Sequence, residues 1–189
     1  MKSRVIVFDF DGTLTRDDTF ISFACHTLGK CSVIRGILMN INHLVGWKLG
    51  LLQGSSVKER LYSTLYKGKS KEEIMAASRD FIPRYRKEMM AAVKRHIEMG
   101  DKVYIITASL DLWMTEIAEK LKVGLICTLT SEDSAGRLDG RFSTPNCHGE
   151  EKVRRLLDKE GDRSEFYLMV YGNEPEDGDS SLFKIADKG

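Results

Sequence analysis

Val5-Ile6-Val7-Phe8-Asp9-Phe10-Asp11-Gly12-Thr13-Leu14-Thr15 is the stretch that decides the fold of this 189-residue chain. Its first four residues are apolar and mostly β-branched, which predicts a strand buried on both faces. Side chains two positions apart on an extended segment point the same way, so we expect Asp9 and Asp11 to face one site. Two like charges buried that close are costly unless a cation or a proton lies between them. The alternative is a solvated strand end, where an aspartate caps the following turn. It is less favoured, because such a turn needs only one aspartate and does not explain the second.

The composition indicates an ordinary globular domain. Hydrophobic residues make up 42% of the chain and charged residues 30%, and the formal net charge is +1. So small a charge provides no field for nucleic acid, and we expect no such partner. Four cysteines are scattered without CxxC spacing, which favours reduced thiols in a cytoplasmic protein over a zinc site. Because the first residues already read as a core strand, no signal peptide is expected.

Strand and helix patterns alternate along the second half of the chain. Strands are expected at residues 103–107, 125–130 and 166–171, and helices at 111–122, 150–159 and 179–186. This spacing predicts an α/β fold, a Rossmann-like parallel sheet with helices on both faces. Asp139-Gly140, between Leu138 and Phe142, predicts a tight hairpin turn.

Residues 17–87 carry no strand pattern and interrupt that alternation. We therefore predict an all-helical cap domain at 17–87, inserted into a core domain formed by residues 1–16 and 88–189. Asp17 or Asp18 can cap the first helix of this segment, which ends near Gly29. Capping boxes are expected at residues 56–59 and 70–73, each a serine followed three positions later by a glutamate.

Residues 33–52 are the most apolar part of the chain and have about the length of a membrane span. Three glycines weaken this stretch, and five polar side chains interrupt it: Arg35, Asn40, Asn42, His43 and Lys48. We therefore expect no transmembrane span but a buried or partly exposed helical pair. Peripheral contact of this part of the cap with a lipid surface stays open.

Three predicted strand ends carry polar groups, and a parallel sheet brings such ends to one edge, where ligands bind. The first is the Asp9/Asp11 pair. The second is Thr107-Ala108-Ser109, where a hydroxyl and turn N–H groups can hold a phosphate oxygen. The third is the acidic loop at residues 173–179, and Lys152, at the start of its helix, can offset phosphate charge. Taken singly, a threonine at a strand end is more often structural and a lysine on a helix is usually solvated. The prediction of a phosphate site therefore rests on the order and placement of these residues together.

That order, Asp9-x-Asp11, Thr107, Lys152 and then the loop from Asn173, resembles the motifs of the haloacid dehalogenase-like (HAD) superfamily. A cap between the first and second motifs is similar to the phosphoserine-phosphatase-like branch, and residues 15–20 and 146–153 also resemble bacterial lipid-phosphate phosphatases. The resemblance implies Mg²⁺-dependent hydrolysis of a phosphomonoester. Asp9 would attack phosphorus and form an aspartyl-phosphate, Asp11 would act as general acid and then base, and Lys152 would neutralise phosphate charge.

The resemblance also assigns binding residues. Phosphate would be held by Gly12, Thr107, Ala108 and Ser109. Asp18 lies where phosphoserine phosphatases keep an acidic residue that meets the substrate amine. Mg²⁺ would be bound by the Asp9 carboxylate, the Asp11 backbone carbonyl and the side chains of Asn173 and Asp177.

The last motif departs from the family pattern. Asn173 stands where an aspartate is usual, and its amide oxygen can bind Mg²⁺ but adds no charge. Glu174 follows where a small residue is usual, and either Asp177 or Asp179 fits the second acidic position. We expect an enzyme that acts on a phosphoserine-like small molecule or a lipid phosphate. The alternative is a catalytically impaired relative that binds a phosphorylated ligand.

Overall fold

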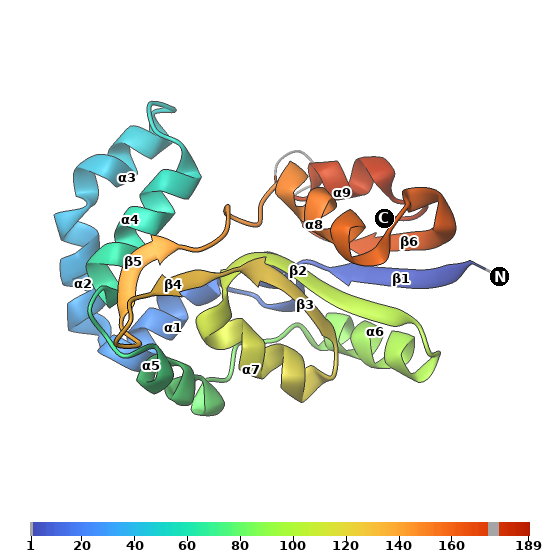
Figure 1. The fold of residues 1–189 in the computed structure, drawn as a ribbon, viewed down its shortest axis with the longest axis horizontal. Coiled ribbons are helices and arrows are strands. Elements are labelled where there is room, and N and C mark those ends of the chain that lie inside the picture. Colours follow the sequence, from blue (N-terminus) through green and yellow to red (C-terminus); the bar gives the residue numbers. More distant parts are fainter. Residues whose placement is uncertain (1, 174–177) are drawn as a thin grey trace.

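The computed structural model describes residues 2–173 and 178–189. Within them a four-stranded sheet has the order β3-β2-β1-β6 (Figure 1). Its strands are β1 (Ser3–Phe8), β2 (Lys102–Leu110), β3 (Gly124–Thr128) and β6 (Phe166–Tyr171). All three neighbouring pairs are parallel, which confirms the predicted α/β fold.

The central strand β1 joins two hydrophobic layers. Ile6 and Phe8 pack into the layer that includes the cap, whereas Val5 and Val7 pack into the layer on the opposite face. None of these four side chains is exposed to solvent. Full burial of such a side chain stabilises the fold by about 1.5–3 kcal/mol. The uninterrupted apolar run is therefore what a strand covered on both faces requires.

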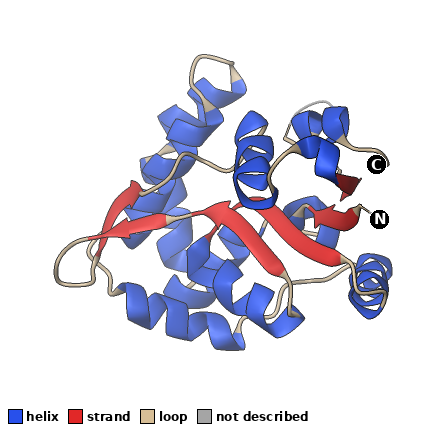
Figure 2. Cartoon of the chain, turned by 45° about the vertical axis from the view of Figure 1, so that its right-hand side comes forward, coloured by secondary structure: helices blue, strands red, loops and turns tan. Residues whose placement is uncertain are grey.

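Helices cover both faces of the sheet, as Figures 1 and 2 show. On one side lie α6 (Lys87–Glu98) and α7 (Asp111–Leu121), and on the other lie α8 (Glu150–Glu160) and α9 (Ser180–Ile185). Short helical turns are found at η1 (Phe10–Leu14), η2 (Ser78–Asp80) and η3 (Arg163–Glu165). The α6 and α7 layer contributes Val93 and Trp113 to the core, and the α8 and α9 layer contributes Leu156 and Leu182.

The segment between β1 and α6 is helical, as expected for a cap. Its helices are α1 (Thr19–Leu28), α2 (Lys30–Met39), α3 (Ile41–Lys48), α4 (Gly54–Tyr66) and α5 (Lys71–Ala77). Asp18 caps α1 by accepting a hydrogen bond from the Phe20 N–H at 2.8 Å, and Ser70 caps α5 through the Glu73 N–H. The expected capping box at residues 56–59 is wrong, because α4 begins earlier, at Gly54. No helix in the described part of the chain has both the length and the apolarity that crossing a membrane requires.

A hairpin from the core packs against the cap. β4 (Thr130–Glu132) and β5 (Leu138–Phe142) pair antiparallel, and β5 lies along α4. The predicted turn at Asp139-Gly140 is wrong, since both residues lie inside β5. The turn is instead formed by residues 133–136, where the Gly136 N–H donates to the Asp133 carbonyl at 3.0 Å. Gly140 serves close packing, because a Cβ there would clash with Ser63 of α4.

Candidate active site

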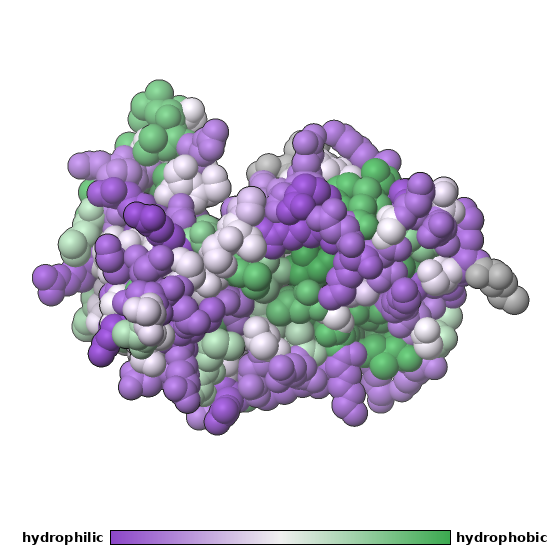
Figure 3. Space-filling view, in the orientation of Figure 1, coloured by the Kyte–Doolittle hydropathy of each residue, from purple (hydrophilic) through white to green (hydrophobic). Residues whose placement is uncertain are grey.

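The carboxyl ends of β1 and β2 and the start of α8 border a cavity of about 900 Å³ below the cap. Figure 3 shows the surface notched here, between the cap helices and α8. The floor of the cavity is polar and includes Asp9, Asp11, Thr107 and Lys152. Its cap side is largely apolar and includes Phe20, Ile21, Leu44, Trp47, Val57 and Leu61. The fold thus brings the predicted residues of two strand ends and of α8 to one cavity.

One ammonium group connects the first and last motifs. Lys152 Nζ donates to Asp9 Oδ1 at 2.8 Å and to Asp179 Oδ1 at 2.6 Å, and all three side chains are at least nine-tenths buried. Burial raises the pKa of Asp9 to about 6, although the charge of Lys152 opposes this rise. Burial lowers the pKa of Lys152, but the two carboxylates more than offset this and keep it charged. Two carboxylates therefore share one positive charge.

Asp11 is held by three hydrogen bonds. Its Oδ1 accepts from the Thr19 N–H at 2.8 Å and from the Thr19 hydroxyl at 2.6 Å, and its Oδ2 accepts from the Ser109 hydroxyl. Burial raises the pKa of Asp11 and the charge of Asp18 adds to the rise, whereas these hydrogen bonds lower it. A carboxyl group with a raised pKa can carry a proton to a leaving group.

The second motif differs from the expectation. β2 continues to Leu110, with a register shift against β3 after Ile106, so Thr107 does not end the strand. The Ser109 N–H donates to Thr107 Oγ1 at 3.0 Å, and the Ser109 hydroxyl is bonded to Asp11. The described contacts of Ser109 thus position Asp11, and phosphate binding by the N–H groups of this segment stays a prediction. Thr107 keeps its own O–H as a donor.

Gly12 and Asn173 lie in contact. Gly12 has φ +79°, and a Cβ at this position would come within 2.5 Å of Asn173 Nδ2. The Thr13 hydroxyl donates to Asn173 Oδ1 at 3.0 Å, which turns the amide toward the loop after β1. Asp177 lies outside the described residues. Asp179 is described, and its contact with Lys152 gives it a place at the site.

Lys58 is a site residue that the sequence analysis missed. It lies on α4, lines the cavity and donates to the Ala108 carbonyl at 2.6 Å, so it connects the cap to the second motif. Burial lowers its pKa, while the charges of Asp11 and Asp18 oppose this. Asp18 also lines the cavity, but one of its oxygens caps α1. In the sequence Lys58 belongs to an expected capping box, and nothing local distinguishes it from a solvated lysine.

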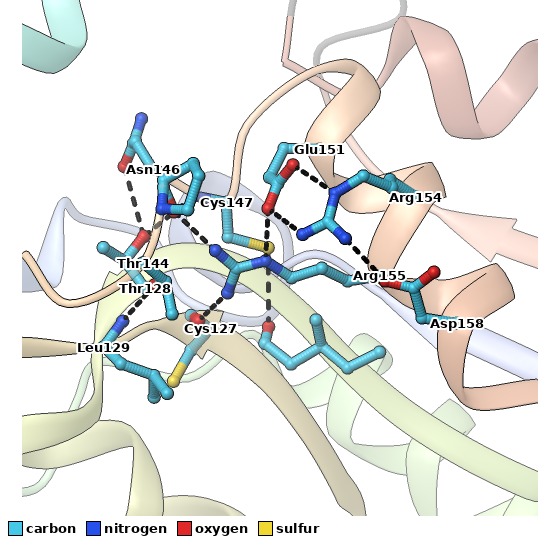
Figure 4. Close-up of polar contacts among 12 residues, drawn as sticks. Cys127, Thr128, Leu129, Thr144, Asn146, Cys147, Glu151, Arg154, Arg155 and Asp158 are labelled. Atoms are coloured by element: carbon cyan, nitrogen blue, oxygen red, sulfur yellow. Dashed lines mark hydrogen bonds and ion pairs between the residues drawn. The ribbon is translucent and has the colours of Figure 1, made fainter.

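Arg155 fixes the loop that leads into α8 (Figure 4). Its guanidinium donates to the Cys127 carbonyl at 2.7 Å, to the Pro145 carbonyl at 2.5 Å and to Glu151 at 2.7 Å. The carbonyls belong to the end of β3 and to the cavity wall, so one side chain ties both to the first turn of α8, which carries Lys152.

Comparison with known proteins identifies the family of this chain. A model of the haloacid dehalogenase-like hydrolase family matches residues 6–179. The chain belongs to this family. This confirms the resemblance predicted from the motifs. Protein CicA of Caulobacter vibrioides is 29% identical to this hydrolase over 193 residues, which cover 97% of the chain and 83% of CicA.

Solved structures share the fold of this hydrolase. A protein of unknown function from Bordetella pertussis Tohama I is 24% identical and has a TM-score of 0.75, over 90% of this chain and 82% of that one. A substrate-bound phosphoserine phosphatase is 20% identical and has a TM-score of 0.66, over 100% of this chain and 85% of that one. At these identities the likeness concerns the fold alone.

Proposed function

We propose that this hydrolase is a Mg²⁺-dependent phosphatase that cleaves a phosphomonoester through an aspartyl-phosphate. The observation that carries the proposal is the buried Lys152 ammonium bonded to both Asp9 and Asp179 at the floor of a cavity. Asp11 lines the same floor with a raised pKa. A nucleophile, a proton donor and a fixed positive charge are thus gathered where a phosphate can enter.

In the first step an Asp9 carboxylate oxygen attacks phosphorus while the bond from phosphorus to the leaving oxygen breaks. Asp11 gives its proton to that oxygen. In the second step Asp11 takes a proton from the water that attacks the aspartyl-phosphate, which releases phosphate and restores Asp9. Throughout, Lys152 neutralises charge on the phosphoryl oxygens, and the Thr107 hydroxyl can donate to one of them.

The donor set fits Mg²⁺. It consists of oxygens. Beside it, the buried carboxylates of Asp9 and Asp179 share the single ammonium of Lys152, so a further cation would reduce the cost of their burial. The Asp9 carboxylate, the Asp11 backbone carbonyl and the Asn173 amide oxygen would hold the ion. When bound, Mg²⁺ supplies charge stabilisation for the transferred phosphoryl group. Among the described residues no group of three or more His, Cys, Asp or Glu side chains is placed to hold a metal ion. Mg²⁺ bound by few protein side chains usually keeps several water ligands.

Two substrate classes follow from the cavity. Asp18 at its wall supports a phosphoserine-like molecule with an amine, and the apolar cap side, with Leu44 and Trp47, supports a lipid phosphate. Lys58 adds positive charge that either substrate can use. The second candidate function, a phosphate-binding relative without turnover, is motivated by Asn173, which brings no charge to the metal site.

The test is hydrolysis of an aryl phosphate with and without Mg²⁺. We expect Mg²⁺-dependent activity that is abolished in Asp9→Asn. Asp17→Asn is the matched control, since Asp17 pairs with Arg84 on the surface, and it should keep full activity. Activity that survives Asp9→Asn would refute the aspartyl-phosphate route. If aryl phosphate, phosphoserine and detergent-dispersed lipid phosphate are all inert but a beryllium fluoride phosphate mimic binds, the binding function is correct.

A further inference from the structure

The cap ends in an apolar surface that the fold does not need for its own core. We define the cap tip as residues 30–52, which form α2, α3 and the turn before α4. Of the thirteen large apolar side chains that are exposed among the described residues, nine lie here: Ile34, Leu38, Met39, Ile41, Val45, Trp47, Leu49, Leu51 and Leu52. Figure 3 shows hydrophobic residues gathered at the top of the cap. Such a concentration marks an interaction surface.

This surface is separate from the face that folds the cap. Val33 and Gly36 are the buried residues of α2, and Asn40, which caps its C-terminus, is also buried. Gly36 contacts Leu65 of α4, and the Asn40 amide donates to the Gly36 carbonyl at 2.8 Å and to Thr64 Oγ1 at 2.9 Å. α2 is thus anchored on one side, to which Ile37 also contributes a partly buried contact with the core. Its side chains Ile34, Leu38 and Met39 face solvent.

The charge of the cap tip has one sign. Residues 19–58 contain no aspartate or glutamate, although the chain has 28 acidic residues. An even distribution would place about six of them in this stretch. Lys30, Arg35 and Lys48 lie within the tip and are exposed. An apolar surface with basic residues and without acidic ones is complementary to an anionic lipid bilayer, whose headgroups attract lysine and arginine.

We propose that the cap tip docks onto the surface of an anionic lipid bilayer, with Leu49 and Leu51 among the headgroups and the basic residues at lipid phosphates. Leu51 is 75% exposed and Leu49 67% exposed, in the turn that projects beyond α3. Trp47 belongs both to the tip and to the cavity wall, so docking places the cavity beside the lipid surface. A second copy of this chain suits the surface less well, because a two-fold contact would bring the basic residues of both copies together.

Trp47 provides a direct readout of docking. The chain has two tryptophans, and Trp113 is fully buried. On vesicles of phosphatidylcholine mixed with phosphatidylglycerol, we expect the tryptophan emission to shift to shorter wavelength and to be quenched by brominated lipid. Vesicles of phosphatidylcholine alone should bind at least about tenfold more weakly, because the basic residues then lose their partners. Trp47→Phe should remove the fluorescence response but keep co-sedimentation with vesicles.

Paired variants test the surface itself. The double variant Leu49→Ser with Leu51→Ser should reduce binding to the anionic vesicles about tenfold or more. Ile82→Ser is the matched control, since Ile82 is 81% exposed outside the cap tip, and it should bind like the unchanged chain. Equal thermal unfolding of both variants shows that the fold is intact. The readout requires no turnover, so it is independent of the proposed phosphatase activity.

Three results would overturn the proposal. One is the absence of binding to anionic vesicles by a folded protein. Another is binding that the double variant leaves unchanged. The third is self-association in sedimentation experiments that the double variant abolishes while vesicles remain unbound, which would assign the cap tip to contact between copies of the chain.

Discussion

Replacing Arg155 by methionine should loosen the loop that leads into α8. The guanidinium makes three hydrogen bonds, to the Cys127 and Pro145 carbonyls and to Glu151, and its side chain is only 12% exposed. A hydrogen bond to a charged group contributes about 1.5–3 kcal/mol, but bonds that share one side chain do not add fully. We therefore expect Arg155→Met to lower the free energy of unfolding by about 3 kcal/mol. Methionine keeps most of the apolar stem, so the loss reports the polar contacts.

Arg154, the neighbouring residue on α8, is a close control. It also bonds to Glu151, but its side chain is 56% exposed and its second partner is Asp158 on the surface. Exposed ion pairs contribute little to stability, so Arg154→Met should lower the free energy of unfolding much less than Arg155→Met. In a chain of this size, 1 kcal/mol corresponds to about 2–4 °C in Tm. The two variants should therefore differ clearly in thermal unfolding followed by circular dichroism.

The two variants should also separate in activity. Arg155 contacts the loop and the helix turn that position Lys152, whereas Arg154 contacts only α8. We expect kcat to fall in Arg155→Met at a temperature at which the variant is folded, and to be unchanged in Arg154→Met. If both substitutions cost the same small amount of stability and leave kcat alike, the reasoning that Arg155 holds the site together is refuted.

Three further predictions concern single positions. Gly12→Ala should cost about 1–2 kcal/mol for its positive φ and more for the clash with Asn173. Gly100→Ala, at φ +74° after α6 with nothing within 4 Å, should show only the first cost in thermal unfolding. Hydrogen bonds from Arg154 and Arg155 lower the pKa of Glu151 from 4.5 to about 2. The ionised carboxylate therefore stabilises the fold fully above pH 4.5, and this contribution is lost as the pH falls toward 2. Glu151→Gln should reduce the difference in Tm between about pH 6 and about pH 3, and an unchanged difference would contradict this. Lys58→Met should lower kcat/KM about tenfold or more at the proposed site because its cation lines the cavity, and full activity of the variant in steady-state assays would exclude that role.

The predictions from sequence are confirmed for strands whose residues form a continuous apolar run. The run before Asp9 is apolar at every position, and this pattern is typical of a strand covered on both faces. The strand at residues 166–171 was predicted with the bounds that the structure has, because it too is a continuous apolar and aromatic run. Asp9 and Lys152 were expected at one site from the order of the motifs and the rule that ligands bind at strand ends. Their hydrogen bond, across 143 positions, was not predicted.

The failures concern contacts that no local pattern encodes. Lys58 meets Ala108 across 50 positions, and Ser109 meets Asp11 across 98. Both depend on how the cap and β2 come together, and a lysine or a serine has the same local pattern whether it is solvated or buried. The prediction at Gly140 was wrong for another reason, since glycine occurs both in tight turns and where two backbones pack closely. The sequence suggested a turn, but the residue allows β5 to approach α4.

The strand order has a consequence for the synthesis of the protein. β1 lies between β2 and β6, and β6 is synthesised well after β1, since Ser3 pairs with Phe166, 163 positions later. Until residues 166–171 emerge, one edge of β1 has no partner, and Val5 and Val7 lack the layer that α9 and β6 help to build. An unpaired apolar edge promotes aggregation. Incomplete chains that end before β6 should therefore depend on chaperones during translation and should not form a smaller stable domain.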